Sequence, residues 1–167
     1  MRKLLTLALL IVLTSTAFSQ KIGHLNTGNV LALMPEVGKA DSILKIYQRD
    51  LMLKRDTIIK MFETEYKAYV GAKQAGTLSA VQDQKRQESL QKQQQAIQQY
   101  GQEVEQNVGI LKKQLLQPIL FKLDEAIQAI GKEGKYQVIL DTSTGSSLFA
   151  SESDDIMAQV KVKLNLK

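Results

Sequence analysis

LKIYQRDLMLKRDTI at residues 44–58 and LQKQQQAIQQYGQEVEQNVGIL at residues 90–111 share one pattern, an apolar residue at every seventh position. Such a repeat is typical of a coiled-coil seam, because 3.5 residues per turn keeps one stripe of each helix facing its partner. The sequence therefore predicts two long helices between Pro35 and about Gly131, folded back on each other as an antiparallel hairpin. The predicted seam residues are Leu44, Tyr47, Leu51, Ile58, Leu90, Ile97, Val104, Val108 and Leu111.

The turn of this hairpin is predicted near residues 76–79. When the two heptad series are paired in opposite directions, their mirror point falls between residues 77 and 78. Gly76 is suited to end the first helix in a left-handed conformation. Ser79 and Gln82 have the spacing of a capping box that opens the second helix. We therefore assign residues 36–117 to a helical hairpin about 60 Å long, which must project from a base formed by the chain ends.

The N-terminal residues 1–19 have the features of a secretory signal peptide. Arg2 and Lys3 precede an apolar run, and Ala17-Phe18-Ser19 places small residues where a signal peptidase cuts, before Gln20. Cleavage between Ser19 and Gln20 predicts a soluble protein outside the cytoplasm. Loss of Arg2 and Lys3 lowers the formal net charge from +5 to +3. The chain contains no cysteine, which excludes disulfides, a lipoprotein anchor and thiolate metal sites.

The remaining residues, 20–35 and 118–167, are predicted to form a small β-rich base. Strands are expected at residues 21–26 and 136–141, and Thr27 is expected to cap a short helical turn after the first strand. A turn at residues 142–146 is expected to join the second strand to a hairpin partner at residues 147–150. The unbroken apolar run at residues 138–140 predicts a strand covered on both faces. A closing helix, capped by Ser153 or Asp154, follows. The predicted core and oligomer contacts are Ile22, Leu25, Val138, Ile139, Leu140, Leu148 and Phe149.

The predicted base is small, and the outer part of the hairpin is rich in glutamine. A base of about fifty residues buries too little apolar surface to be stable as a monomer, so we expect an oligomer. Pro118 should mark the point where the hairpin leaves the base, because proline disrupts a helix interior. Eleven glutamines between Val81 and Gln106 leave the outer seam poor in apolar residues. This arm is either a solvated coiled-coil surface or a deliberately pliable element.

The residues near the predicted tip carry more positive than negative charge. Such clusters are usually solvated faces, and the alternative is contact with acidic polypeptides or peripheral contact with anionic lipid. The candidate residues are Lys73, Lys85, Arg86 and Lys92.

No arrangement of residues indicates catalysis, a metal site or a cofactor site. The only histidine, His24, lies on a predicted strand and is expected to be structural. The acidic residues are spread over helix faces, without paired carboxylates in an apolar setting. The glycines of residues 131–135 end a helix, whereas a phosphate loop opens one. An enzyme is therefore not expected. A nucleic-acid-binding protein is not expected either, given export, the small net charge and the lack of a basic, aromatic groove.

The order of these segments resembles the Skp/OmpH family of periplasmic chaperones over nearly the whole mature chain. The resemblance depends on the order and spacing of several short motifs. They are Ile22 to Asn26, Pro35-Glu36 with Ala40, Pro118-Ile119, Ala126-Ile127 to Lys135-Tyr136, Val138 to Asp141, and Asp155-Ile156 with Val160 and Leu164-Asn165.

This resemblance implies a predominantly helical α+β fold that assembles as a homotrimer. Three bases would share a β-barrel-like core, and three helical arms would surround a cavity. Family members hold unfolded outer-membrane proteins in such a cavity during transit across the periplasm, without ATP. Two other classes share a helical hairpin: a structural coiled-coil protein of the envelope, and an adaptor of an efflux or secretion system. The adaptor would need a larger β region than about fifty residues can form.

Overall fold

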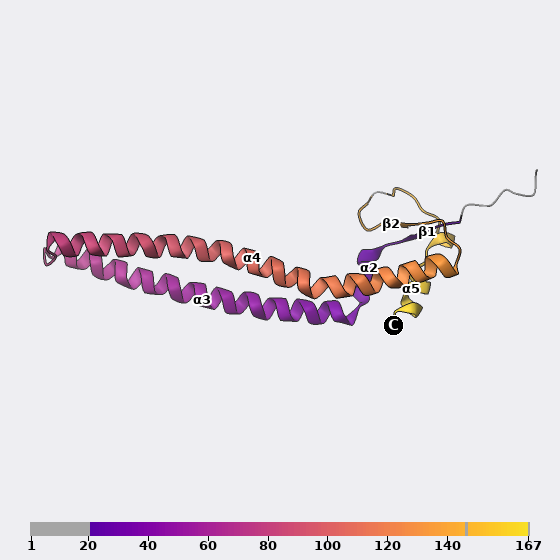
Figure 1. Cartoon of the computed structure of the whole chain (residues 1–167), viewed down its shortest axis with the longest axis horizontal. Helices are drawn as coiled ribbons and strands as arrows, with labels where there is room; N and C mark the ends of the chain where they lie inside the picture. Colours follow the sequence, from indigo (N-terminus) through magenta and orange to yellow (C-terminus); the bar gives the residue numbers. More distant parts are fainter. Residues whose placement is uncertain (1–20, 146, 167) are drawn as a thin grey trace, which may run out of the picture. The chain divides into compact units, whose positions relative to one another are not determined.

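The computed structural model describes residues 21–145 and 147–166 and is mostly helical (Figure 1). The elements are β1 (Ile22–Leu25), α2 (Thr27–Leu33), α3 (Pro35–Gln74), α4 (Ala80–Glu133), β2 (Val138–Asp141), a 3₁₀ turn (Glu152–Asp154) and α5 (Met157–Lys163). The predicted α+β class, with long helices and a small sheet, is confirmed. The predicted signal peptide and its cleavage site lie outside the described residues.

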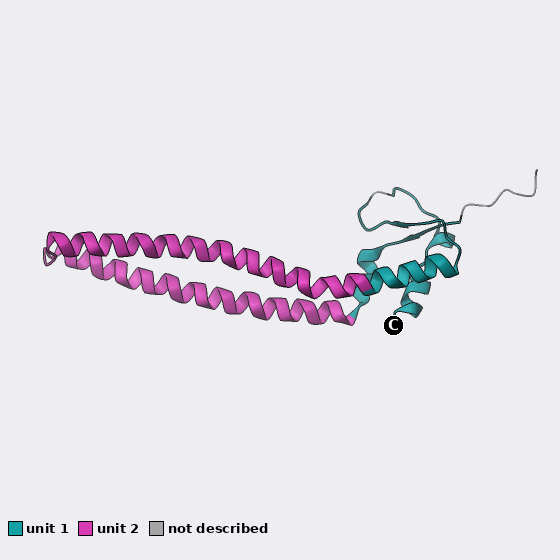
Figure 2. Cartoon of the chain, viewed as in Figure 1, with its two compact units in different colours: residues 1–34, 122–167 teal, residues 35–121 magenta. Residues whose placement is uncertain are grey.

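The chain divides into two compact units (Figure 2). Unit 1 comprises the residues up to Met34 and those from Lys122 onward, and unit 2 comprises Pro35–Phe121. The boundary falls inside α4, which continues through Pro118 as one helix although proline removes a backbone hydrogen bond there. No helix in the described part of the chain is long and apolar enough to cross a membrane.

Unit 2 is the predicted helical hairpin, and its turn follows from local sequence. Pro35 occupies the first position of α3, where a fixed φ and a missing N–H cost nothing. Gly76 has a φ of 66°, the left-handed conformation that ends a helix. The Ser79 hydroxyl accepts from the Gln82 N–H at 3.3 Å, and the Gln82 side chain accepts from the Ser79 N–H at 3.0 Å. The predicted capping box is therefore confirmed.

Unit 1 contains a two-stranded parallel sheet. Ile22 pairs with Val138 and Leu25 with Asp141. Parallel strands need a crossover connection, and here α2, α3 and α4 provide it. On its other side β1 makes a single bridge, between His24 and Asp155. β1 therefore has a backbone partner on both sides, whereas one edge of β2 has no strand partner among residues 21–145 and 147–166.

The apolar core of unit 1 is formed by side chains of β1, α2, the last turns of α4, and α5 with its flanking residues. Because α5 is amphipathic, its positions spaced by four residues point inward, and Ile156 and Val160 are fully buried. The buried residues of this core are Leu25, Val30, Met34, Leu123, Ala126, Ile130, Ile156, Val160 and Leu164.

Two expectations about the sheet are wrong within the single chain. Residues 147–150 form no strand, and the strand beside β2 is β1, parallel to it. β2 is also not covered on both faces, since Val138 is 47% and Leu140 49% exposed. The apolar run at residues 138–140 is therefore not explained by burial within a single chain.

Two expected helix caps are also wrong, by one residue for α2 and by two or three residues for α5. The cap of α2 is Asn26, whose side-chain oxygen accepts from the Asn29 N–H at 3.0 Å, and Thr27 is the first helical residue. α5 begins at Met157, after the 3₁₀ turn that contains Ser153 and Asp154. The Asp155 carboxylate accepts from the Met157 N–H at 2.8 Å and so satisfies a free donor at that end.

Candidate functional site

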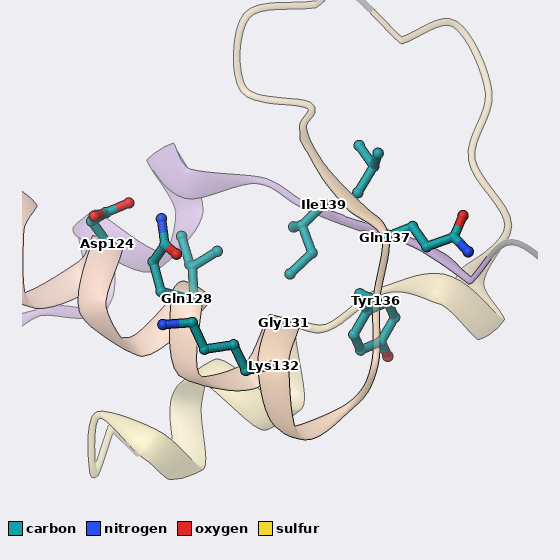
Figure 3. Close-up of a pocket in the computed structure, with 9 residues that line it drawn as sticks. Asp124, Gln128, Gly131, Lys132, Tyr136, Gln137 and Ile139 are labelled. Carbon is teal, nitrogen blue, oxygen red and sulfur yellow. The ribbon is translucent and has the colours of Figure 1, made fainter.

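A hollow of about 440 Å³ lies between the last turns of α4 and strand β2 in unit 1 (Figure 3). Asp124, Gln128 and Lys132 line it from α4. Tyr136 and Gln137 line it from the segment before β2, and Ile139 lines it from β2 itself. It contains no cysteine, histidine or serine that could act as a nucleophile or base. The hollow has no catalytic constellation.

His24 and Asp141 are engaged in hydrogen bonds that connect segments of unit 1. The Nε2 atom of His24 lies 2.8 Å from the Ser151 carbonyl oxygen and ties β1 to the segment before α5. The Asp141 carboxylate accepts from the Thr27 hydroxyl at 2.7 Å and the Ser143 N–H at 2.9 Å. Although burial raises the pKa of Asp141, these hydrogen bonds outweigh it and hold the pKa below its usual value. Among the described residues, no three acidic or histidine side chains are placed to hold a metal.

A polar network closes the tip of the hairpin, and we call its members Tyr69, Lys73, Asp83 and Gln87 the tip cluster. The Tyr69 hydroxyl donates to Asp83 at 2.7 Å and accepts from Lys73 at 2.8 Å and from Gln87 at 2.9 Å. Lys73 also bonds Asp83, at 3.1 Å. Tyr69 is 8% exposed and joins α3 to the first turn of α4, where a carboxylate is favoured by the helix dipole.

The tip cluster shifts both of its charged groups toward their ionised forms. The hydrogen bond from Tyr69, and then that from Lys73, lowers the pKa of Asp83. The hydrogen bond to Tyr69, and then that to Asp83, raises the pKa of Lys73. The stabilisation through Asp83 is therefore complete above the ordinary aspartate pKa and is lost as pH falls through the lowered value. The stabilisation through Lys73 is complete below the ordinary lysine pKa and is lost as pH rises through the raised value.

Replacing Tyr69 with phenylalanine should raise the pKa of Asp83 toward its ordinary value, because the hydroxyl is the strongest cause of the shift. The measurement is an NMR titration of the Asp83 side-chain carboxyl carbon. Tyr66→Phe is the matched control, since Tyr66 lies on the same helix and is 50% exposed. If the Asp83 midpoint were the same in Tyr69→Phe and the unaltered protein, the tip cluster would not be formed in solution.

The nine predicted seam residues lie on the inner side of the hairpin, and each of them is at least half-buried. Leu90 is buried, at 7% exposure, and the other eight are half-buried. Polar contacts join the two helices at the same levels. Ser89 donates to Glu65 at 3.4 Å, Gln93 also donates to Glu65, and the Tyr100 hydroxyl donates to the Leu51 carbonyl at 3.4 Å. Two helices bury only one stripe each, so the seam stays half-open to solvent.

The predicted tip cations do not share one environment. Lys73 is held in the tip cluster by Asp83 and Tyr69. Lys85, Arg86 and Lys92 are exposed and make no ion pair or side-chain hydrogen bond that the described part of the chain shows. Only the last three therefore present free positive charge.

The predicted base residues separate into a buried member and exposed ones. Leu25 is fully buried, and Ile139 is half-buried. Ile22 is 44% exposed, and Leu148 and Phe149 are 103% and 87% exposed. Val138 and Leu140 on β2 are exposed as well, so five of the seven predicted base residues are left uncovered by the described chain.

A second apolar stripe on α3 was not among the predicted sites. Ile43, Ile46, Leu53 and Met61 are between 49% and 68% exposed. We call these four residues the α3 stripe. The seven-residue repeat predicts only the seam. The signal for the stripe is a different spacing: Ile43 and Met61 lie eighteen residues apart, which is five helical turns, and therefore point in the same direction.

Comparison with known proteins gives one family and one fold. The family model described as "Outer membrane protein (OmpH-like)" matches residues 21–164. No curated protein matches the chain. The crystal structure of a candidate outer membrane chaperone (OmpH-like) from Caulobacter crescentus CB15 is similar, with a TM-score of 0.73 and 19% sequence identity. The match covers 87% of this chain and 83% of that one, so the two share a fold over most of their length.

Proposed function

The chain belongs to the OmpH-like family, and on that premise we propose that it is an ATP-independent periplasmic holdase that keeps unfolded outer-membrane proteins from aggregating. Chaperone function holds at the level of the family, whose members are not enzymes. The binding of particular clients, in a cavity between helical arms, is our proposal. The observation that carries it is the hairpin of residues 35–121, in which α3 and the first part of α4 pair with each other and leave large apolar side chains exposed.

The physical properties of the hairpin suit a holdase. An unfolded membrane β-barrel exposes apolar side chains and unpaired strand edges, which pair with other chains and aggregate. A long arm with many separate apolar contacts holds such a chain weakly at each point and strongly in sum. Release then needs no single high-energy step, which agrees with a function that uses no nucleotide.

Assembly as a homotrimer is part of the proposal, and its supporting observation lies in unit 1. β2 exposes Val138 and Leu140, and one of its edges has no strand partner in the part of the chain that the structure describes. Leu148 and Phe149 are exposed on the segment that follows. Exposed edge strands with apolar side chains are a liability unless another chain covers them. The exposed apolar side chains support self-association in general. That the assembly contains three chains is inferred from the resemblance to the family.

Location and lipid contact complete the proposal. The signal-peptide pattern of residues 1–19, with cleavage between Ser19 and Gln20, favours export to the periplasm. Lys85, Arg86 and Lys92 are free cations near the hairpin tip and suit peripheral contact with anionic lipid or with acidic clients. No nucleic-acid partner is proposed.

Dilution of a urea-unfolded porin into buffer containing the purified mature protein tests the function. We expect light scattering from porin aggregates to fall in proportion to added protein and to reach a minimum at a fixed stoichiometry, without nucleotide. Lysozyme at equal mass is the control for non-specific crowding and charge. Unchanged scattering would instead favour a structural or adaptor-type coiled-coil protein of the envelope.

A further inference from the structure

Two open grooves lie on one face of the hairpin. The first, of about 480 Å³, is lined by Ile43, Ile46, Tyr47 and Asp50 of α3 and by Asn107, Ile110, Leu111 and Gln114 of α4. The second, of about 460 Å³, is lined by residues of α3 alone: Thr57, Lys60, Met61, Thr64, Glu65 and Ala68.

Helical spacing places both grooves on the same face of α3. Met61, Thr64 and Ala68 follow Ile43, Ile46 and Asp50 by eighteen residues each. Eighteen residues make five turns of an α-helix, so corresponding side chains point in the same direction. Leu53 lies between the grooves and is 60% exposed. The α3 stripe therefore runs along the hairpin outside its seam, where a soluble protein rarely leaves so many large apolar side chains.

We propose that the α3 stripe is the surface on which unfolded polypeptide docks, through apolar segments flanked by acidic residues. This inference rests on the proposed holdase function and identifies its contact surface. The occupant follows from the pattern of the stripe and from the charge of unit 2.

The pattern of the stripe does not suit a partner helix. A helix packing here would contact positions 43, 46, 50, 53, 57, 60 and 64, the heptad series of this face. Three of these seven positions hold apolar residues, and the other four hold Asp50, Thr57, Lys60 and Thr64. A continuous seam is therefore absent, and the apolar contacts come singly. Leu53 follows Ile46 by about 10 Å and Met61 follows Leu53 by about 12 Å, which an extended chain spans with three or four residues.

The charge of unit 2 favours an acidic occupant and disfavours a second hairpin. Residues 35–121 hold thirteen lysines and arginines and ten aspartates and glutamates, so unit 2 carries the whole net charge of +3 of the mature chain. Lys60 lines the second groove, and Lys92 lies five turns before Ile110 on the same face of α4. Both carboxylates that line the grooves already have partners: Asp50 is paired with Arg49 at 3.0 Å, and Glu65 accepts from Ser89 and Gln93. Complementary charge attracts an acidic chain, whereas two like-charged hairpins repel.

The test compares two double variants of the mature protein. Leu53→Gln with Met61→Gln removes two members of the stripe. Met52→Gln with Tyr66→Gln is the matched control, because these residues are 52% and 50% exposed on another face of the same helix. The probe is a fluorescently labelled, urea-unfolded porin, titrated with each protein after dilution of the urea. Circular dichroism checks that both variants keep their helices.

We expect the stripe variant to bind the porin about tenfold more weakly, equivalent to about 1.4 kcal/mol, and the control to bind within about twofold of the unaltered protein. Binding should also weaken at 1 M salt, where the screening length is about 3 Å. Equal affinities for the two variants would overturn the inference alone. A change in sedimentation mass with unchanged porin affinity would show that the stripe is an interface between copies. Failure of the unaltered protein to bind the porin would overturn the proposed function itself.

Discussion

Leu25→Ala is expected to unfold unit 1. Leu25 has no exposed surface, and truncating a buried leucine costs about 2–5 kcal/mol because a cavity remains. A unit of about sixty residues has roughly 3–5 kcal/mol of stability from its core. The loss is therefore comparable to the whole stability of the unit. The measurement is hydrogen exchange followed by mass spectrometry, in which the peptides of β1, β2 and α5 should lose their protection.

The matched control for this result is Leu148→Ala, the same substitution at a side chain that is 103% exposed. Within one copy of the chain it leaves no cavity, and slow exchange in β1 and α5 should be retained. Retained protection in Leu25→Ala would mean that the core described for unit 1 does not hold it together. Peptides from α3 serve as an internal reference, since unit 2 has its own contacts.

Replacing Leu148 and Phe149 together with aspartate is expected to abolish self-association. Both side chains are almost fully exposed in the single chain and belong to the segment that follows β2 in sequence. If they are buried between copies, as we propose, two carboxylates there lose their hydration without a partner, at a cost of several kcal/mol per charge. The measurement is the mass from sedimentation equilibrium, which should fall to that of one chain while the hydrogen exchange of β1 and α5 changes little.

A pair of substitutions with equal charge controls for simple repulsion. Ser151→Asp with Ser153→Asp adds the same two negative charges to neighbouring, exposed polar positions. This variant should keep the mass of the unaltered protein. An unchanged mass for the Leu148 and Phe149 variant, or an equal loss in the serine variant, would contradict the proposed interface.

The features of unit 2 that were predictable depend on residues close together in the chain. Gly76 and the reciprocal bonds of Ser79 and Gln82 set the turn within a few residues. Pro35 begins α3 because its own ring fixes the needed φ. The tip cluster was not predicted, because the bonds of Tyr69 to Asp83 and Gln87 need the exact packing of two helices.

The features of unit 1 that were not predictable depend on residues far apart. Residues 138–141 form a strand as expected, but their partner is β1, more than one hundred residues earlier. A short turn at residues 142–146 favoured the nearby segment 147–150 instead, since local hairpins cost less chain entropy to close. Asn26 caps α2 in place of Thr27, because the Thr27 hydroxyl donates to Asp141, 114 residues later in the chain.

Helix periodicity, turn chemistry and charge could be derived from the chain alone, because each depends on neighbours within a few residues whose geometry hardly varies between proteins. Which strand pairs with β2, which apolar residues are buried and which remain bare followed from packing. Leu25 and Leu148 have the same chemistry, and their sequence context does not say that one is enclosed and the other exposed. Burial is a property of all the segments that meet at a point, and the apolar surface left over is where we expect this chaperone to meet its partners.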